Sequence, residues 1–131
     1  MNWLKQFRQK HSLPSDFSHS ATQAFIPFAE HLVAKCTAKT SPQFVGINGC
    51  QGSGKSTLAA YFAHRLWHQY NCRTAVISLD DFYFDAKTRN ELARRVHPLL
   101  QTRGVPGTHD TEALRQCLQA LQLGQPLLLP R

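Results

Sequence analysis

The chain has 131 residues, with 15 Lys and Arg against 8 Asp and Glu, and therefore a formal charge of +7 when histidine is neutral. Its composition, 42% hydrophobic and 18% charged, is that of a globular domain and excludes a disordered, collagen-like or coiled-coil chain. No apolar run approaches the roughly 20 residues of a membrane-spanning helix, and the first residues lack the apolar core and cleavage site of a secretory signal. We therefore expect a cytoplasmic protein with no membrane partner.

The cysteines are too far apart for a C-x-x-C motif, and no histidine cluster completes a zinc pattern. They are Cys36, Cys50, Cys72 and Cys117. Because no secretory signal precedes them, reduced thiols are favoured over disulfides.

The first part of the chain predicts helices. Apolar side chains recur at helical spacing in residues 2–11 and again in residues 18–39, with a break between the two patterns. Pro27 bends or divides the second pattern, because proline removes a main-chain donor. Nothing in this stretch points to catalysis, so we assign residues 1–43 to an N-terminal helical segment that packs on the core.

A strand, a helix and a second strand follow. Residues 44–47 are apolar and partly β-branched, as in a strand covered on both faces. Residues 56–70 predict a helix with a wide buried face, and Asn71 ends it. Two rows of side chains make up this face: Leu58, Phe62, Leu66 and Tyr70, and Ala59, Ala63 and Trp67. Residues 74–79 predict the second strand, so the sequence predicts an α/β fold with parallel strands.

The rest of the chain alternates helices and loops. Residues 87–96 predict a short helix, and residues 99–109 form a loop rich in glycine and proline. Asp110 has the features of an N-cap for the next helix, which Gly124 ends. The inner face of that helix is predicted to carry Leu114, Leu118 and Leu121. A third extended element begins at residues 126–130.

The strongest motif is a full match to the phosphate-binding pattern G-x-x-x-x-G-K-[ST], formed by Gly49, Cys50, Gln51, Gly52, Ser53, Gly54, Lys55 and Ser56. Main-chain N–H groups can surround a phosphate chain only where side chains are absent and glycine takes positive φ. Lys55 adds a positive charge for the phosphates, Ser56 a hydroxyl for Mg²⁺, and Thr57 a further donor. A dinucleotide-binding fingerprint fits less well, because no third spaced glycine follows Gly54.

An acidic pair, Asp80 and Asp81, follows the second predicted strand. Ligands of open α/β sheets bind beyond the carboxyl ends of the strands, so we expect this pair in the same crevice as the phosphate loop. One carboxylate can accept a proton from an attacking hydroxyl while the other orients Mg²⁺ or its waters. The alternative is that both only cap or solvate the strand end. Tyr83 is assigned to packing or to a pocket wall.

A loop at residues 103–110 places a cation, a hydroxyl and an imidazole ahead of a helix. Arginine offers a bidentate fork to a carboxylate, and the helix N-terminus offers free N–H groups. We predict that Arg103 and His109 grip an anionic substrate. The alternative leaves Arg103 in water and Asp110 as an ordinary cap. Arg89, Arg94 and Arg95 are assigned to a solvated helix face, and the alternative is that they extend the positive rim of this loop.

The segments GINGCQGSGKST, ISLDDFY and HPLLQTRGVPGTHD together resemble the D-glycerate 3-kinase branch of P-loop kinases, over roughly residues 44–131. Relatives of that branch are phosphoribulokinase, uridine kinase and pantothenate kinase. The resemblance implies a three-layer α/β/α fold and the transfer of a γ-phosphoryl group from ATP, with Mg²⁺, to a hydroxyl of a small acceptor, D-glycerate first. It implies Lys55 and Asp80 as catalytic residues. It places Ser56 at the metal with Asp81 beside it, and the role of Asp81 stays open. The residues it places toward the acceptor are Asp80, Tyr83, Arg103 and His109.

Members of that family continue past the PLLLPR stretch into a further strand, a lid and an adenine-side loop. We therefore expect residues 44–131 to form a P-loop kinase core that is incomplete at its C-terminus. Two alternatives stay open: a noncatalytic nucleotide-binding module, and a kinase with an acceptor such as uridine or pantothenate. Nucleic-acid binding is disfavoured, because the cations are spread along the chain without a run of five.

Overall fold

The structure is a computed structural model that describes residues 2–37 and 41–126. The chain divides into two compact units, Met1–Val76 and Ile77–Arg131. Except for Pro126, the third extended element predicted at residues 126–130 lies outside the described residues. None of the helices in the described ranges is both long enough and apolar enough to cross a membrane.

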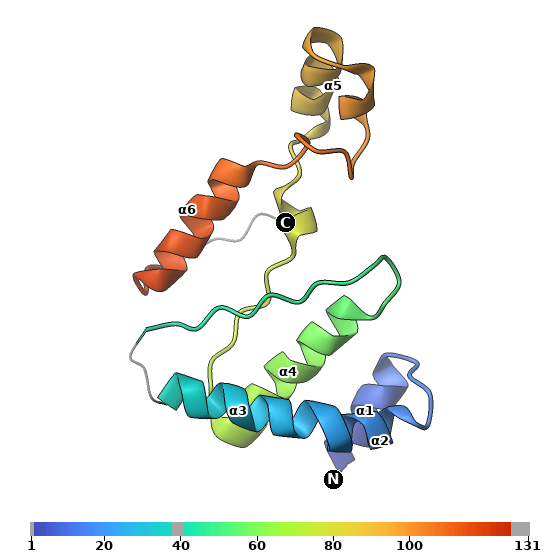
Figure 1. The fold of residues 1–131 in the computed structure, drawn as a ribbon, viewed down its shortest axis with the longest axis vertical. Coiled ribbons are helices and arrows are strands. Elements are labelled where there is room, and N and C mark those ends of the chain that lie inside the picture. Colours follow the sequence, from blue (N-terminus) through green and yellow to red (C-terminus); the bar gives the residue numbers. More distant parts are fainter. Residues whose placement is uncertain (1, 38–40, 127–131) are drawn as a thin grey trace. The chain divides into compact units, whose positions relative to one another are not determined.

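Helices α1, α2 and α3 open the first unit (Figure 1). They cover Asn2–Lys10, Phe17–Ser20 and Ile26–Thr37, and a π-helical turn, η1, joins the last two at Ala21–Phe25. Both predicted helical patterns are confirmed over these ranges. Pro27 follows the wide turn, and its ring cannot fit against the carbonyl four residues earlier in a regular helix. The wider turn therefore lets the chain stay helical through the proline.

Helix α4, Lys55–Tyr70, is the long helix of the first unit, and it confirms the helix predicted at residues 56–70. It ends at Asn71, which takes the left-handed conformation with φ 50°. The buried core of the unit joins α4 to the N-terminal helices, and its residues are Leu4, Phe7, Ala21, Ala29, Tyr61, Phe62 and Leu66. The N-terminal helices thus fix the helix that follows the phosphate loop.

The buried face of α4 differs from the predicted one. Tyr61 is fully buried against aromatic rings of the N-terminal segment, and Arg65 is 5% exposed. Trp67, by contrast, is 46% exposed, so its assignment to a buried row is wrong. The reason is that the N-terminal helices cover the side of α4 that carries Tyr61, while no strand of the described residues covers the side with Trp67.

The strands predicted at residues 44–47 and 74–79 are not formed. Across residues 2–37 and 41–126 the chain has no strand, and Figure 1 shows both segments as extended chain. Leu79 instead begins a 3₁₀ turn. Parallel strands need hydrogen-bonded neighbours and helices over both faces, whereas Phe44 and Val76 are 53% and 48% exposed here. The predicted three-layer sheet is therefore not shown by this structure.

Over its described residues, 77–126, the second unit has two helices and two 3₁₀ turns (Figure 1). These are η2 (Leu79–Phe82), α5 (Ala86–Arg95), η3 (Pro98–Gln101) and α6 (Thr111–Gln122). Both helices were predicted, and both have carboxylate caps: Asp85 accepts from the Thr88 N–H at 2.7 Å, and Asp110 accepts from the Ala113 N–H at 2.9 Å. The N-cap role predicted for Asp110 is confirmed.

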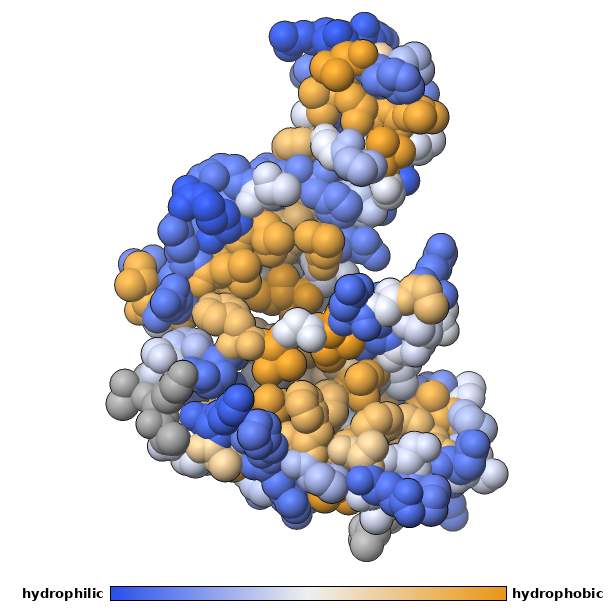
Figure 2. Space-filling view, viewed as in Figure 1, coloured by the Kyte–Doolittle hydropathy of each residue, from blue (hydrophilic) through white to orange (hydrophobic). Residues whose placement is uncertain are grey.

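Few of the described residues of the second unit are buried, and these are Phe82, Leu100, Thr108 and Cys117. The buried residue of α6 is Cys117, which was not predicted to lie on the inner face of the helix. Leu118 was predicted to lie there, but it is 37% exposed. Figure 2 shows hydrophobic side chains on the outside of this unit, over α6 and over α5 with η3. The exposed ones include Val96, Leu99, Leu118 and Leu123. All four cysteines of the chain are free thiols.

Candidate functional site

The phosphate-loop motif forms a turn that leads directly into α4. Gly52 and Gly54 have φ of 77° and 86°, a region that glycine enters without steric cost. Gly49 is close-packed for a different reason: a Cβ atom there would lie 2.8 Å from the Ser53 hydroxyl oxygen, which would have to move. The loop therefore has the closely folded backbone for which the motif selects small residues.

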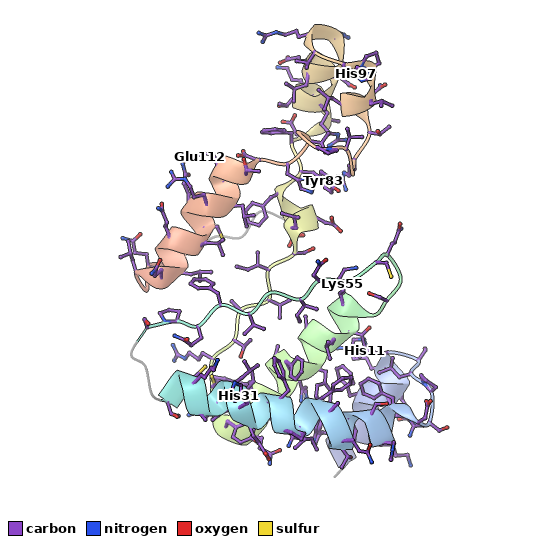
Figure 3. The ribbon with its side chains drawn as sticks, viewed as in Figure 1. His11, His31, Lys55, Tyr83, His97 and Glu112 are labelled. Atoms are coloured by element: carbon purple, nitrogen blue, oxygen red, sulfur yellow. The ribbon has the colours of Figure 1, made fainter. Side chains whose placement is uncertain are left out.

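Lys55 is the first residue of α4, beside the loop that precedes it (Figure 3). Its ammonium donates a hydrogen bond to the Cys50 carbonyl at 2.8 Å, across the loop. Before the loop, the Asn48 side chain accepts from the Gly49 N–H at 2.8 Å. The first N–H groups of a helix have no partner inside the helix, and they carry its partial positive charge. The start of α4 thus presents a fixed cation and free N–H groups to an anion.

The loop is open to a ligand. Its exposed residues are Gly49, Cys50, Gln51, Gly52, Ser53, Gly54 and Ser56, with Lys55 and Thr57 half-buried. No group of three or more His, Cys, Asp or Glu side chains in the described ranges forms a ready metal site. Mg²⁺, however, is commonly held by one or two side chains together with substrate phosphates and water. The exposed hydroxyl of Ser56 fits that kind of site.

The acidic pair lies in η2, in the second unit. Ser78 precedes this turn: its hydroxyl accepts from the Asp80 N–H at 3.3 Å, and its carbonyl accepts from the Asp81 N–H at 3.1 Å. Both carboxylates are exposed, and neither accepts a hydrogen bond from another described residue. A tight turn, not a strand end, therefore presents the two carboxylates to a ligand.

An antiparallel bridge joins Tyr83 to His109, two of the residues predicted to face the acceptor. Two main-chain hydrogen bonds flank the bridge, from Phe84 to Thr108 at 2.9 Å and from Asp110 to Phe82 at 2.7 Å. Across it the Tyr83 ring stacks on the His109 imidazole, with centroids 3.9 Å apart and planes at 29°. The bridge thus brings the residue that follows η2 against the residue that precedes the cap of α6.

Arg103 completes this group. Its guanidinium carbon lies 5.4 Å from the centroid of the Tyr83 ring, within the range of a cation–π contact. The Nε2 atom of His109 is buried and has no hydrogen-bond partner in the part of the chain that the structure describes. The structure therefore brings Tyr83, Arg103 and His109 together, and we call them the Tyr83 cluster. The phosphate loop belongs to the first unit, and the acidic pair and the Tyr83 cluster belong to the second.

Two side chains without a predicted ligand role hold the loop that carries the cluster. Thr108 is fully buried, and its hydroxyl donates to the Val105 carbonyl at 2.6 Å. Arg89 of α5 donates to the Phe84 carbonyl and, at 3.2 Å, to the Gln101 carbonyl. Its assignment to a solvated helix face is therefore wrong. No motif signals this role, because it depends on how α5 folds back toward the loop.

Comparison with known proteins finds kinases. The uncharacterized kinase mug58 of Schizosaccharomyces pombe is 44% identical over 85 residues, which is 63% of this chain and 30% of mug58. The probable ATP-dependent kinase TDA10 of Saccharomyces cerevisiae is 34% identical over 89 residues, 65% of this chain and 31% of TDA10. The chloroplastic D-glycerate 3-kinase of Arabidopsis thaliana is 37% identical over 83 residues, 61% of this chain and 18% of that enzyme. No protein-family model and no solved structure matches the chain.

The chain thus spans a third or less of the length of these relatives. The resemblance to P-loop kinases is confirmed at the level of homology, since the homologues are kinases and include a D-glycerate 3-kinase. Homology to such kinases implies an α/β fold, of which the described residues form helices but no strand.

Proposed function

We propose that this chain carries the phosphate-binding and acceptor-binding parts of an ATP-dependent kinase that phosphorylates a hydroxyl of D-glycerate. The observation that supports this acceptor best is the Tyr83 cluster, in which an arginine and an imidazole meet on one aromatic ring. The same chain holds a complete phosphate loop.

The phosphate loop, residues 49–57, binds the triphosphate of ATP through its main-chain N–H groups and Lys55. The Lys55 ammonium exchanges its bond to the Cys50 carbonyl, 2.8 Å long here, for a phosphate oxygen. Ser56 would hold Mg²⁺ together with the phosphates and water, and the bound ion would neutralise charge on the phosphates, with Asp81 as the predicted second ligand.

Asp80 is the base in this proposal. Its exposed carboxylate accepts the proton of the acceptor hydroxyl as that oxygen forms a bond to the γ-phosphorus, while the bond from the γ-phosphorus to the ADP oxygen breaks. The phosphoryl group passes directly to the acceptor oxygen, so the Asp80 carboxylate forms no covalent intermediate. Its contribution is proton transfer and orientation of the attacking oxygen.

The Tyr83 cluster binds the carboxylate of the acceptor. A guanidinium can donate two parallel hydrogen bonds to a carboxylate, so Arg103 supplies both charge and orientation. A buried nitrogen without a partner costs about 1–3 kcal/mol, and a ligand oxygen at His109 Nε2 removes that cost. Tyr83 stacks on the imidazole and keeps its plane fixed. An acidic acceptor is therefore favoured over a neutral nucleoside.

The test uses the longest available form of the protein with ATP and Mg²⁺, and offers D-glycerate, L-glycerate, uridine and pantothenate in parallel. ADP release gives kcat/KM for each, and phosphorus NMR identifies the product. We expect D-glycerate to have the highest kcat/KM. A higher value for uridine or pantothenate would reject the acceptor. ATP binding without transfer to any acceptor would favour the noncatalytic module.

A further inference from the structure

A groove between α1 and α4 lies within the first unit. Its volume is about 310 Å³, and its walls are Trp3, His64, Arg65, His68 and Gln69. Small-molecule sites in proteins begin at about this size. None of these residues belongs to the phosphate loop or to the Tyr83 cluster, so the proposed kinase reaction leaves the groove without a role.

Arg65 makes this groove unusual, because it is 5% exposed and forms no ion pair with a described residue. The described residues contain one ion pair, Glu112 with Arg115, in the other unit. The Nε atom of Arg65 is buried and has no hydrogen-bond partner within residues 2–37 and 41–126. Arginine is almost never fully buried unless it is paired, since burying an unpaired charge is costly. The groove therefore holds a cation that is short of an anionic partner.

Two imidazoles lie beside Arg65 on α4. His64 stacks on Trp3, with centroids 5.0 Å apart and planes at 16°, and the rings of His68, at 4.3 Å, and Phe7, at 6.4 Å, also lie beside it. The Nδ1 atom of His64 is buried, with no hydrogen-bond partner among the residues that the structure describes. Burial lowers the pKa of His64, and the charges of His68 and Lys10 lower it further. The two charged groups that act on His64 are thus both basic, and the other titratable side chain beside Arg65 on α4 is the Tyr61 phenol.

The charge of the whole unit has the same sign. Residues 1–76 contain eight Lys and Arg but two acidic residues, Asp16 and Glu30. Neither of these forms an ion pair with a described residue. A metal cation is a poor occupant, because the buried guanidinium of Arg65 would repel it. An anion gains from the same charge.

We propose that this groove is a binding site for a small oxyanion, the phosphate or carboxylate group of a small molecule, with Arg65 as the fixed cation and His64 and His68 as further donors. Trp3 forms the flat wall against which the rest of such a molecule lies. This site is separate from the phosphate loop, and it does not depend on the proposed kinase function.

The experiment titrates the protein with sodium sulfate and follows tryptophan fluorescence. The Trp67→Phe change leaves Trp3, in the groove, as the one tryptophan of the chain. The Lys55→Ala change in the same protein weakens the phosphate loop as a competing site. Sodium chloride at equal ionic strength is the reference. We expect a saturable change with sulfate, tightening as the pH falls from about 8 to 5.5, because the His64 imidazole gains a proton while sulfate stays a dianion.

Variants then assign the binding. Arg65→Gln should weaken sulfate binding at least about tenfold, since hydrogen bonds to charged groups are the strong ones. Arg73→Gln removes an exposed cation of the same unit outside the groove and should change nothing. His68→Gln, at an exposed position of α4, tests the site if Arg65→Gln does not fold, and should weaken sulfate binding because it changes a proposed donor.

Inorganic phosphate and acetate, titrated in the same way, separate a phosphate ligand from a carboxylate ligand. A sulfate response equal to that of chloride would overturn the proposal. So would binding that Arg65→Gln and His68→Gln leave unchanged. A response that is lost in a longer form of the protein would also overturn it, since other parts of the polypeptide would then cover the groove.

Discussion

The ring of Tyr83 stacks on the imidazole of His109 at a centroid distance of 3.9 Å, across the antiparallel bridge between these two residues. Main-chain hydrogen bonds flank the bridge on both sides and hold the two backbone segments at this spacing. The stack therefore sets where the buried Nε2 atom of His109 points. Arg103 contacts the same tyrosine ring, so one aromatic side chain positions both proposed ligands of the acceptor.

Replacing this tyrosine should affect the acceptor and not the nucleotide. An aromatic pair contributes about 0.5–1.5 kcal/mol beyond its buried area, which is roughly a two- to tenfold change in binding. We expect Tyr83→Ala to raise KM for the acceptor by about that factor in the longest active form, with KM for ATP unchanged. Tyr83→Phe keeps the stack and should stay within about twofold. If Tyr83→Phe raised KM for the acceptor as much as Tyr83→Ala, the hydroxyl and not the stack would be responsible.

The Lys55 ammonium is the fixed charge of the phosphate loop, so its removal should weaken nucleotide binding. A hydrogen bond to a charged group contributes about 1.5–3 kcal/mol, and we therefore expect Lys55→Ala to weaken ADP binding by about 10- to 100-fold. Isothermal titration calorimetry on the 131-residue chain measures this directly. Lys87→Ala removes an exposed lysine of α5 and serves as the control. Unchanged ADP affinity in Lys55→Ala would reject the phosphate-loop assignment.

Gly49 offers a test of the loop geometry itself. A methyl group there would meet the Ser53 hydroxyl oxygen at 2.8 Å, so Gly49→Ala should distort the loop and weaken ADP binding. The double variant Gly49→Ala with Ser53→Ala removes the oxygen that clashes. We expect it to bind ADP more tightly than Gly49→Ala alone, and Ser53→Ala alone gives the reference. If Gly49→Ala binds like the unmodified chain, the close approach does not exist in solution.

Asp80 is the proposed base, and its amide analogue has nearly the same shape without the proton acceptor. General base catalysis contributes about 10²–10⁴-fold, so Asp80→Asn in the longest active form should lower kcat by that factor. ADP affinity should stay within about twofold, because the carboxylate is in η2 and not in the phosphate loop. Asp81→Asn should instead raise the Mg²⁺ concentration needed for activity. Near-normal turnover of Asp80→Asn would move the base elsewhere.

Local chemistry allowed much of the helical structure to be predicted. The caps at Asp85 and Asp110 and the stop at Asn71 depend on residues within a few positions, so a single sequence contains their signals. The phosphate loop is local in the same sense. The strands at residues 44–47 and 74–79 are different, because a strand exists only with a paired neighbour, and the described residues supply none.

The Tyr83 cluster was predicted as a set of residues but not as a contact. Arg103 and His109 follow from the chemistry of one loop, while their meeting on Tyr83 requires a bridge between separate segments. The burial of Arg65 was not predicted at all, since helical spacing cannot show which neighbour covers a charged residue. A shared crevice for the phosphate loop and Asp80 stays a prediction.

The lowered pKa of His64 should make the first unit less stable to unfolding in acid. Burial holds its pKa below the ordinary 6.5, so the unfolded chain binds more protons than the folded one as the pH falls. Stability therefore rises with pH: the contribution of His64 is fully present above about pH 6.5 and is lost as the pH falls through the lower value of the folded state. Urea unfolding between about pH 5 and 8 measures this, and both tryptophans, Trp3 and Trp67, report on this unit.

The variant His64→Phe keeps an aromatic ring against Trp3 and removes the titrating group, so its unfolding midpoint should depend less on pH across this range. Glu112 does not interfere. Hydrogen bonds from Arg115 and Gln116 lower its pKa to about 2 from the ordinary 4.5, so its contribution is complete above about pH 4.5 and is lost only as the pH falls through about 2. The buffers must be free of sulfate and phosphate, because an anion in the groove would favour the protonated imidazole and oppose the effect. An unchanged pH dependence in His64→Phe would assign the acid sensitivity to other groups.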